Sequence, residues 1–415
     1  VRVVDGAVMP VRRARGYAPQ PLPLPALASA APCVLACGPQ QKATIALTRE
    51  DANGTSACFV SQHIGDVENG ATFDAWNAAR TRLEDLFDLA PAALACDLHP
   101  SYLSSQWARE QAQEQGLPLV EVQHHHAHIA SVMAEAIAAG QLGSDARVLG
   151  IAFDGTGAGT DGTIWGGEFL VAGLADFERT AHLRTWALPG GAASVRDARR
   201  NAFALLSELG LLEHPGAAGL LDSLDEQTRN ITTTMIERNI NSPRTSSMGR
   251  LFDAAAAILG ICGQATYEGE PAIELETAAW RALGGKSASS TDSQAGASTP
   301  ADGSPILDPQ PLFEALLDGI EAGAPTDRLA LNFHIAIARA SARIASEICT
   351  REGIDTVALS GGVFMNRLLL QLLTRELKDA GLAALVPRTV PVNDGCIAYG
   401  QAAVARARLA QTAPR

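Results

Sequence analysis

Four histidines in five positions mark the stretch of this chain with the clearest capacity for chemistry, QHHHAHIAS at residues 123–131. His124 and His128 are spaced i,i+4, so on a helix their rings lie on one face and can bind one metal ion. An apolar run ends at Val122, and an alanine-rich segment without Gly or Pro continues until Gly140. This pattern predicts a strand followed by a helix, with the histidines at the junction where α/β proteins bind ligands.

A carboxylate is expected beside these histidines. Asp154, in VLGIAFDGTG, is predicted to end the next strand. If that strand and the strand ending at Val122 are neighbours in a parallel sheet, their carboxyl ends meet at one edge and the carboxylate reaches the imidazoles. Chance clustering or a polar helix start would also give such a sequence. The spacing, the junction and the following DGTG favour a metal-binding cleft.

Three glycine-containing turns are candidates for nucleotide binding: ACGPQQKATIAL, FDGTGAGTDGTIW and SGGVFMNRLL. Such turns present backbone N–H groups without obstruction by side chains, as a phosphate requires. The third turn leads a strand directly into a helix, whose N-terminus can favour an anion or hold a nucleoside. Any one of them could be an ordinary turn, but their combination predicts a nucleotide site.

Composition restricts the class of protein. The 415 residues are enough for two or three domains, and 47% hydrophobic residues fit a well-packed α/β protein. The formal charge of -13 argues against nucleic acid as the main partner. Seven scattered cysteines without a CxxC pair indicate a reducing compartment, and no apolar run approaches the roughly 20 residues that span a bilayer. We therefore expect a cytoplasmic protein without a membrane partner.

The order of predicted elements indicates a duplicated fold. Residues 32–145 read as β-β-β-α-β-α-β-α, and residues 146–415 repeat that order with insertions. Predicted helices fill residues 195–284, and the Ser/Ala/Gly/Thr-rich residues 284–305 are predicted to be disordered. Residues 1–31 are predicted to be the tail of an upstream domain and a proline-rich linker, so we expect a fragment of a longer chain.

Duplicated α/β halves with two phosphate-type turns and a GG motif resemble the sugar kinase, heat-shock protein and actin superfamily, which implies actin-like lobes with a nucleotide cleft between them. The chain also carries, in this order, the motifs VQHHHAHIAS, FDGTGAGTDGTIWGGEF, SMGRLFDAAAAILG, YEGEPAIELE, LSGGVFMNRLL and VNDGCIAYGQA. These motifs and their order resemble the C-terminal domain of the HypF carbamoyltransferase family. The opening RRARGYAP resembles the junction that follows the family's YrdC-like domain.

This resemblance implies a transfer reaction in nickel–iron hydrogenase maturation. In the family, upstream domains make carbamoyl-adenylate, and the C-terminal domain passes the carbamoyl group to the C-terminal cysteine of the partner HypE, where it later becomes a cyanide ligand. We expect the transfer step here, with ATP, AMP or carbamoyl-adenylate, possible Mg, a HypE-like partner and upstream domains of the same polypeptide. Alternatives are an O-carbamoyltransferase, a tRNA threonylcarbamoyl transferase-like enzyme, or a non-enzymatic, nucleotide-dependent docking module.

The resemblance also implies a metal site. Carried over residue by residue, its ligands are His124, His128, Asp154 and Asp394. Two nitrogens with carboxylate oxygens suit Fe or Zn. His125 and His126 are expected to be hydrogen-bonded bystanders, although one of them could orient the ligands or meet the carbamoyl group.

The implied nucleotide site lies in the glycine-containing turns and in the segment SSMGR: Lys42, Gly155, Thr156, Gly157, Ser247, Gly249, Gly361, Gly362 and Asn366. Ser247 could equally be the N-cap of a helix that starts near Gly249. Lys42 could equally be an exposed lysine. No residue is assigned to catalysis, because the attacking thiol comes from the partner and the chain's own cysteines are expected to be inert.

Overall fold

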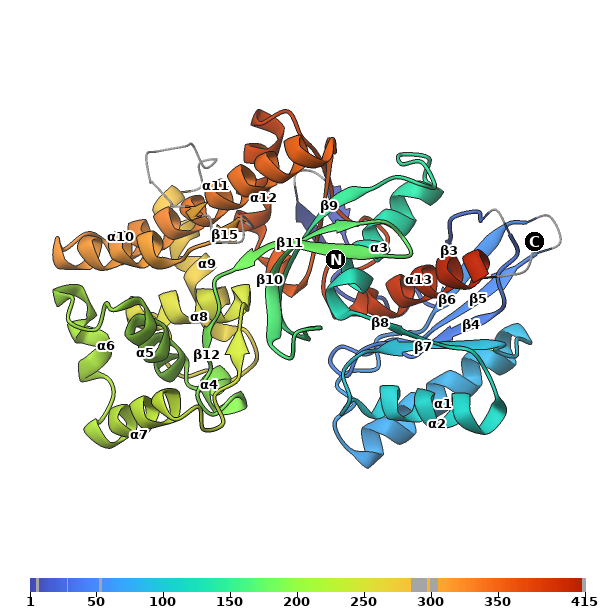
Figure 1. The fold of residues 1–415 in the computed structure, drawn as a ribbon, viewed down its shortest axis with the longest axis horizontal. Helices are drawn as coiled ribbons and strands as arrows, with labels where there is room; N and C mark the ends of the chain where they lie inside the picture. The colour runs from blue at the N-terminus through green and yellow to red at the C-terminus, as the bar shows by residue number, and fades with distance from the viewer. Residues whose placement is uncertain (5–6, 28, 52–53, 285–296, 299–304, 413–415) are drawn as a thin grey trace.

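The computed structural model describes all residues except 5–6, 28, 52–53, 285–296, 299–304 and 413–415. Two lobes, each built around a mixed sheet, make up the protein (Figure 1). Among the described residues, no helix is both long and apolar enough to span a membrane.

The first lobe follows the predicted β-β-β-α-β-α-β-α order. Its elements are β4 (Val34–Ala36), β5 (Ala46–Glu50), β6 (Ser56–Val60), α1 (Gly70–Phe87), β7 (Ala93–Asp97), α2 (Leu103–Gln115), β8 (Leu119–Val122) and α3 (His124–Ala138). The sheet order is β6-β5-β4-β7-β8, with β4, β5 and β6 antiparallel and β4, β7 and β8 parallel. Strand β7 is buried at every position because helices cover both faces of the sheet.

The second lobe repeats this topology, which confirms the duplicated actin-like fold. Its elements are β9 (Val148–Ala158), β10 (Ile164–Ala172), β11 (Phe177–Leu183), α11 (Thr326–Glu352), β16 (Thr356–Ser360), α12 (Arg367–Asp379), β17 (Ala383–Leu385) and α13 (Ile397–Thr412). The central sheet order is β11-β10-β9-β16-β17, matching β6-β5-β4-β7-β8 strand for strand. Two chain segments of one topology therefore face each other across the molecule (Figure 1).

Helices fill most of the chain between β11 and α11 and gather on the second lobe (Figure 1). They are α4 (Ala192–Arg196), α5 (Ala198–Leu209), η1 (Pro215–Ala217), α6 (Ala218–Asp222), α7 (Glu226–Glu237), α8 (Met248–Ile258), α9 (Glu270–Leu283) and α10 (Gln310–Glu321). Short strands accompany them: β12 (Trp186–Ala187), β13 (Arg244–Thr245), β14 (Ala297–Ser298) and β15 (Ile306–Leu307). Most of the predicted disordered segment, residues 284–305, lies outside the described residues.

The predicted linker at residues 1–31 contributes to the folded protein. Strands β1 (Arg2–Val4) and β2 (Ala7–Met9) pair with each other, and β3 (Pro21–Pro23) pairs with β6 at the edge of the first sheet. An edge strand tolerates the prolines of PLP, because their missing N–H groups are not needed by a further strand. The first sheet therefore begins before residue 32.

The last helix of each half packs against the sheet of the other half. Helix α3 lies on β9, β10 and β16, whereas α13 lies on β4 to β8 and also packs along α3. Gly150 of β9 faces Ile129 of α3, and Gly400 of α13 faces the backbone of Ala127, so a side chain would not fit at either glycine. The histidine helix is thus fixed against the strand that carries Asp154.

Gly400→Ala is expected to destabilise the protein by about 1–3 kcal/mol, because the added methyl group overlaps the Ala127 carbonyl between two packed helices. Gly219→Ala is the matched control, since Gly219 is also helical but a Cβ added there would have no neighbouring atom within 4 Å. That variant should keep or slightly raise stability. Denaturant midpoints of the two variants provide the comparison, and equal midpoints would contradict close packing of α3 on α13.

Candidate metal and nucleotide site

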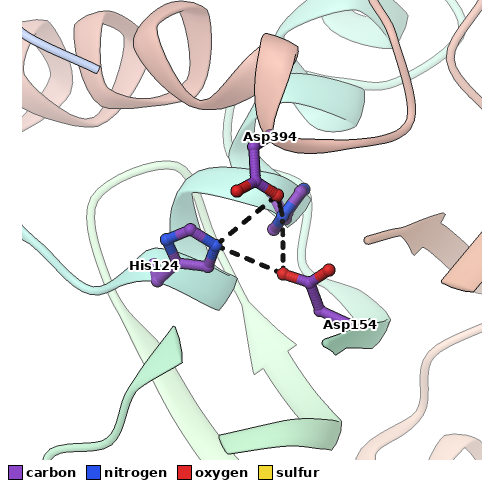
Figure 2. A group of neighbouring side chains, drawn as sticks. His124, Asp154 and Asp394 are labelled. Atoms are coloured by element: carbon purple, nitrogen blue, oxygen red, sulfur yellow. Dashed lines mark hydrogen bonds and ion pairs between the residues drawn. The ribbon is translucent and has the colours of Figure 1, made fainter. Parts of the chain in front are cut away.

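His124, His128, Asp154 and Asp394 converge on one buried point. One ligand atom from each residue lies within 4.8 Å of the others. His124 Nε2 is 3.3 Å from Asp154 Oδ2 and 4.0 Å from Asp394 Oδ1, and His128 Nε2 is 3.4 and 3.6 Å from the same two atoms. Figure 2 shows the two carboxylates and the His124 ring facing one another. The structure brings together all four residues predicted as metal ligands.

The route by which Asp154 reaches the histidines differs from the prediction. Strands β8 and β9 belong to different sheets, so they are not parallel neighbours. Asp154 also does not end its strand, because β9 continues to Ala158. Instead, α3 of the first half packs on β9 of the second half and carries the imidazoles to the carboxylate.

A bulge in β9 turns Asp154 toward the cleft. Phe153 pairs with Gly167 and Gly157 pairs with Trp165, so three residues of β9 oppose the single residue Gly166 of β10. Extra residues on one strand interrupt the hydrogen bonds between the two strands and redirect the side chains at that place. Asp154 and the two residues that follow it therefore belong to the wall of a cleft.

Partners on the outer side of each imidazole orient the two Nε2 atoms. His124 Nδ1 lies 2.8 Å from Asp97 Oδ2, and His128 Nδ1 lies 3.1 Å from Ser360 Oγ and 3.3 Å from Cys396 Sγ. A partner at Nδ1 directs Nε2 to a metal in this way in many proteins. The sequence reading missed Asp97, although its position at the end of β7, beside β8, carried the same signal as Asp154.

These residues fit a divalent metal ion. Nitrogen and oxygen atoms bound at about 2.0–2.2 Å from one ion lie about 3–4 Å apart, as the histidine nitrogens and the carboxylate oxygens do here. His128 Nε2 is buried and makes no hydrogen bond to any described residue. Burial alone would lower the pKa of His124, but hydrogen bonds to Asp154 and Asp97 outweigh it and raise the pKa to about 10. Without a metal, both ring nitrogens of His124 are therefore protonated at neutral pH.

Metal binding is expected to release protons. The proton on His124 must leave Nε2 before a metal can bind there, so metal affinity should rise with pH up to about 10 and fall in acid. Calorimetric titration of Zn in buffers of different ionisation enthalpy at pH 7 should show about one to two protons released per ion. Zero released protons would contradict a site on these histidines.

His124, His128, Asp154 and Asp394 together are called the metal-type cluster below. This cluster opens on a cleft of about 310 Å³. Asp154 and Asp394 line this cleft. So do six of the nine residues predicted for the nucleotide: Lys42, Gly155, Thr156, Gly249, Gly362 and Asn366. One cavity is thus shared by the predicted metal ligands and most of the predicted nucleotide residues.

The other three predicted nucleotide residues lie behind the cleft wall. Ser247 is the N-cap of α8: its Oγ accepts a hydrogen bond from the Arg250 backbone N–H at 3.1 Å and donates one to the Gly155 carbonyl at 2.6 Å. Gly157 packs against the rings of His124 and His125. Gly361 has φ +114° and packs on the backbone of β9. All three support the lining residues without lining the cleft.

Two further histidines of α3 do not belong to the four-residue cluster. His126 Nε2 lies 2.9 Å from the Gly173 carbonyl oxygen, and its ring packs near Phe177. His125 Nδ1 lies 3.1 Å from the Gln123 side-chain amide nitrogen. Burial lowers the pKa of both rings, so each is neutral.

Lys42 brings a positive charge from the first lobe into the cleft. The backbone of Lys42 has φ +49°. The Lys42 Nζ lies 3.2 Å from both carboxylate oxygens of Glu268 on the second lobe. Burial would lower the pKa of Lys42, but the carboxylates of Asp394, Glu268 and Asp154 outweigh it and raise the pKa. A charged ammonium therefore faces the metal-type end of the cleft, as a phosphate site requires.

The sequence also led to no prediction for a buried ion pair that lines the cleft. Arg250 Nε lies 2.8 Å from Asp253 Oδ2 on α8; both residues are buried and line the cleft. Asp253 Oδ1 has no hydrogen-bond partner among the described residues, so it can accept from a ligand hydroxyl or amine. A buried i,i+3 charge pair within the apolar segment GRLFDAAAA was the available signal.

The N-terminus of α12, expected to favour an anion or hold a nucleoside, already has a carboxylate partner. Glu276 Oε1 accepts hydrogen bonds from the backbone N–H groups of Arg367 at 2.8 Å and Leu368 at 3.3 Å. Glu276 also lines the cleft. This helix end therefore suits a neutral nucleoside better than a phosphate.

Comparisons with known proteins identify the family of the chain. Residues 150–401 match the family described as carbamoyltransferase, Kae1-like domain, second subdomain, and residues 29–135 match the HypF Kae1-like domain. A carbamoyltransferase HypF homolog of Cupriavidus necator is 39% identical, covering 92% of this chain and 93% of that protein. Carbamoyltransferase HypF of Synechocystis is 37% identical, covering 97% of this chain and 50% of that protein.

A solved structure shows the same fold. The crystal structure of full-length HypF in the phosphate- and nucleotide-bound form superposes with a TM-score of 0.86 at 35% identity, over 97% of this chain and 59% of that one. The chain spans about half the length of several of the curated relatives that it matches. The chain belongs to the HypF family of carbamoyltransferases, and it corresponds to the family's Kae1-like part.

Proposed function

We propose that this chain transfers a carbamoyl group from carbamoyl-adenylate to the C-terminal cysteine of a HypE-like partner, for the cyanide ligands of nickel–iron hydrogenase. The main observation behind the proposal is that Asp154 belongs to the histidine–carboxylate cluster and also lines the cleft. A metal held by the cluster and a phosphate in the cleft would therefore be neighbours. A full-length HypF with bound phosphate and nucleotide supports a nucleotide in this family.

In this proposal the two ends of the cleft bind different parts of the adenylate. Asp253 Oδ1 and Asn366 supply an acceptor and an amide at the nucleoside end. Lys42 places a positive charge at the phosphate end, and Gly155, which has no side chain, lets the phosphate approach the backbone of β9. The carbamoyl group is then directed away from the nucleoside, toward the metal-type cluster.

The metal, as Fe or Zn, would be held by His124, His128, Asp154 and Asp394, and it would supply Lewis-acid stabilisation of charge on the phosphate. Lys42, which its raised pKa keeps charged, would add its positive charge to that stabilisation. In the transfer, the partner's thiol sulfur forms a bond to the carbamoyl carbon, the carbon–oxygen bond to phosphate breaks, AMP leaves and the thiol proton passes to water. No cysteine of this chain is needed as a covalent intermediate.

Mass spectrometry tests the proposal directly. The protein is mixed with pre-formed carbamoyl-adenylate, Zn or Fe(II), and a peptide that ends in cysteine. The expected product is a peptide heavier by one carbamoyl group, whereas a peptide ending in serine should remain unmodified. Supplying the adenylate separates transfer from activation of carbamoyl phosphate. Equal modification with and without the protein, or transfer to the serine peptide, would contradict the proposal.

A further inference from the structure

Asn366 is a cleft residue whose side chain is held from behind by a histidine of the core. Its Oδ1 accepts a hydrogen bond from the Leu369 backbone N–H at 2.9 Å, which makes Asn366 the N-cap of α12. Its Nδ2 lies 2.9 Å from Nε2 of His334, a fully buried residue of α11. The amide is therefore fixed between a helix end and the core of the second lobe.

The direction of each hydrogen bond follows from one unambiguous donor. The Leu369 backbone nitrogen can only donate, so the Asn366 atom that faces it is the oxygen. The amide nitrogen then faces His334, which must accept through Nε2. The His334 proton is consequently on Nδ1, which lies 2.7 Å from the Ala330 carbonyl oxygen. Burial lowers the pKa of His334 to about 4, so the ring keeps this neutral form at neutral pH.

One amide hydrogen remains for a ligand. The Asn366 nitrogen carries two hydrogens, and His334 accepts one of them. Asn366 lines the cleft beside Glu276, which also lines it and accepts hydrogen bonds from the backbone N–H groups of the two residues after Asn366. A ring nitrogen or ribose oxygen of a nucleoside can accept the second hydrogen, provided that the amide does not rotate. A fixed donor binds such an acceptor more tightly than a mobile one.

We propose that His334 is a positioning residue for nucleotide recognition, which holds the Asn366 amide so that its free hydrogen faces the bound nucleoside. The inference rests on the proposed binding of an adenine nucleotide in this cleft. His334 does not touch the ligand; it acts through Asn366. It also packs edge-to-face on Phe252, with ring centroids 5.1 Å apart, so a packing role alone must be distinguished from a positioning role.

Calorimetric titration of AMP distinguishes the two roles. Asn366→Ser keeps a good helix cap but removes the amide, and His334→Leu removes the acceptor that holds it. Each should weaken AMP binding roughly three- to tenfold, and the double variant should be no weaker than either single variant. His334→Gln should stay within about twofold of the wild-type affinity, because its oxygen can accept from Asn366 and its nitrogen can donate to Ala330. Zn affinity should be unchanged throughout, because neither His334 nor Asn366 belongs to the cluster of His124, His128, Asp154 and Asp394.

The outcomes separate this inference from the function on which it rests. Wild-type protein that binds no AMP would overturn the proposed nucleotide site, and this inference with it. Wild-type binding with unchanged affinity in His334→Leu, or with additive losses in the double variant, would overturn the inference alone. If His334→Leu does not fold, the AMP affinity of His334→Gln decides between the two roles. An AMP affinity as low as that of Asn366→Ser would overturn the inference, because the glutamine oxygen would then accept from Asn366 without restoring AMP binding.

Discussion

A His124→Ala, His128→Ala double variant is expected to bind no divalent metal in the cleft. The two Nε2 atoms are the only nitrogens among the four clustered donors, and the remaining carboxylates of Asp154 and Asp394 cannot complete the site. Loss of an outer partner of a metal-bound histidine typically costs about 10–100-fold in affinity, and loss of a ligand costs at least as much. The double variant should therefore lose affinity by on the order of a hundredfold or more.

His126→Gln is the matched control. His126 lies on the same helix and is equally buried, but its Nε2 faces the Gly173 carbonyl and not the carboxylates. Elemental analysis after dialysis against Zn should find about one ion per chain in the wild type and in the control. Full occupancy in the double variant would place the metal elsewhere.

Replacing Asp394 with asparagine is expected to weaken metal and nucleotide together. Asp394 Oδ1 lies 3.6 Å from His128 Nε2, and the residue also lines the cleft, so it borders both ligands. Asparagine has nearly the same shape but lacks the charge that a cation requires. We expect metal affinity to fall about 10–100-fold. If the two ligands stabilise each other, ADP binding measured with metal present must weaken as well, because such coupling is reciprocal.

Calorimetric titration of ADP with and without Zn measures this coupling. In the wild type, Zn should strengthen ADP binding, and Asp394→Asn should reduce that gain while changing metal-free ADP binding little. Helix capping does not explain such a result, because the cap of η3 (Asp394–Cys396) is Asn393, whose Oδ1 accepts from the Gly395 N–H at 3.0 Å. Unchanged ADP affinity in the variant at saturating Zn would disprove a shared site.

Local patterns in the sequence predict the order of elements and the metal-type residues, but not the packing that unites them. The i,i+4 spacing of His124 and His128 depends on one helix only, so it can be recognised without a structure. The crossing of α3 and α13 to opposite sheets depends on close contacts at Gly150 and Gly400, which are distant in sequence from their partners. The proximity of Asp154 to the two histidines was therefore predicted correctly, although the predicted neighbouring strands were wrong.

The sequence did not reveal residues whose side chains form hydrogen bonds to a helix or strand that is distant in the sequence. Glu276 on α9 caps α12, a pairing across about 90 residues that no local pattern reveals. Ser247 has the sequence context both of a helix cap and of a nucleotide contact, and the structure shows the cap. The prolines of β3 resemble those of a linker, yet an edge strand accommodates them equally well.

One measurement tests the central claim, that metal and nucleotide share a single cleft. Crystals grown with Zn and AMP can be measured at the zinc absorption edge, where anomalous scattering locates the ion. We predict one strong peak between His124 Nε2, His128 Nε2 and the carboxylates of Asp154 and Asp394, with the AMP phosphate beside Gly155. The claim would be contradicted by a zinc peak found only beside His214, Asp318 and Glu321, which form a more exposed group. AMP bound outside the cleft would contradict it as well.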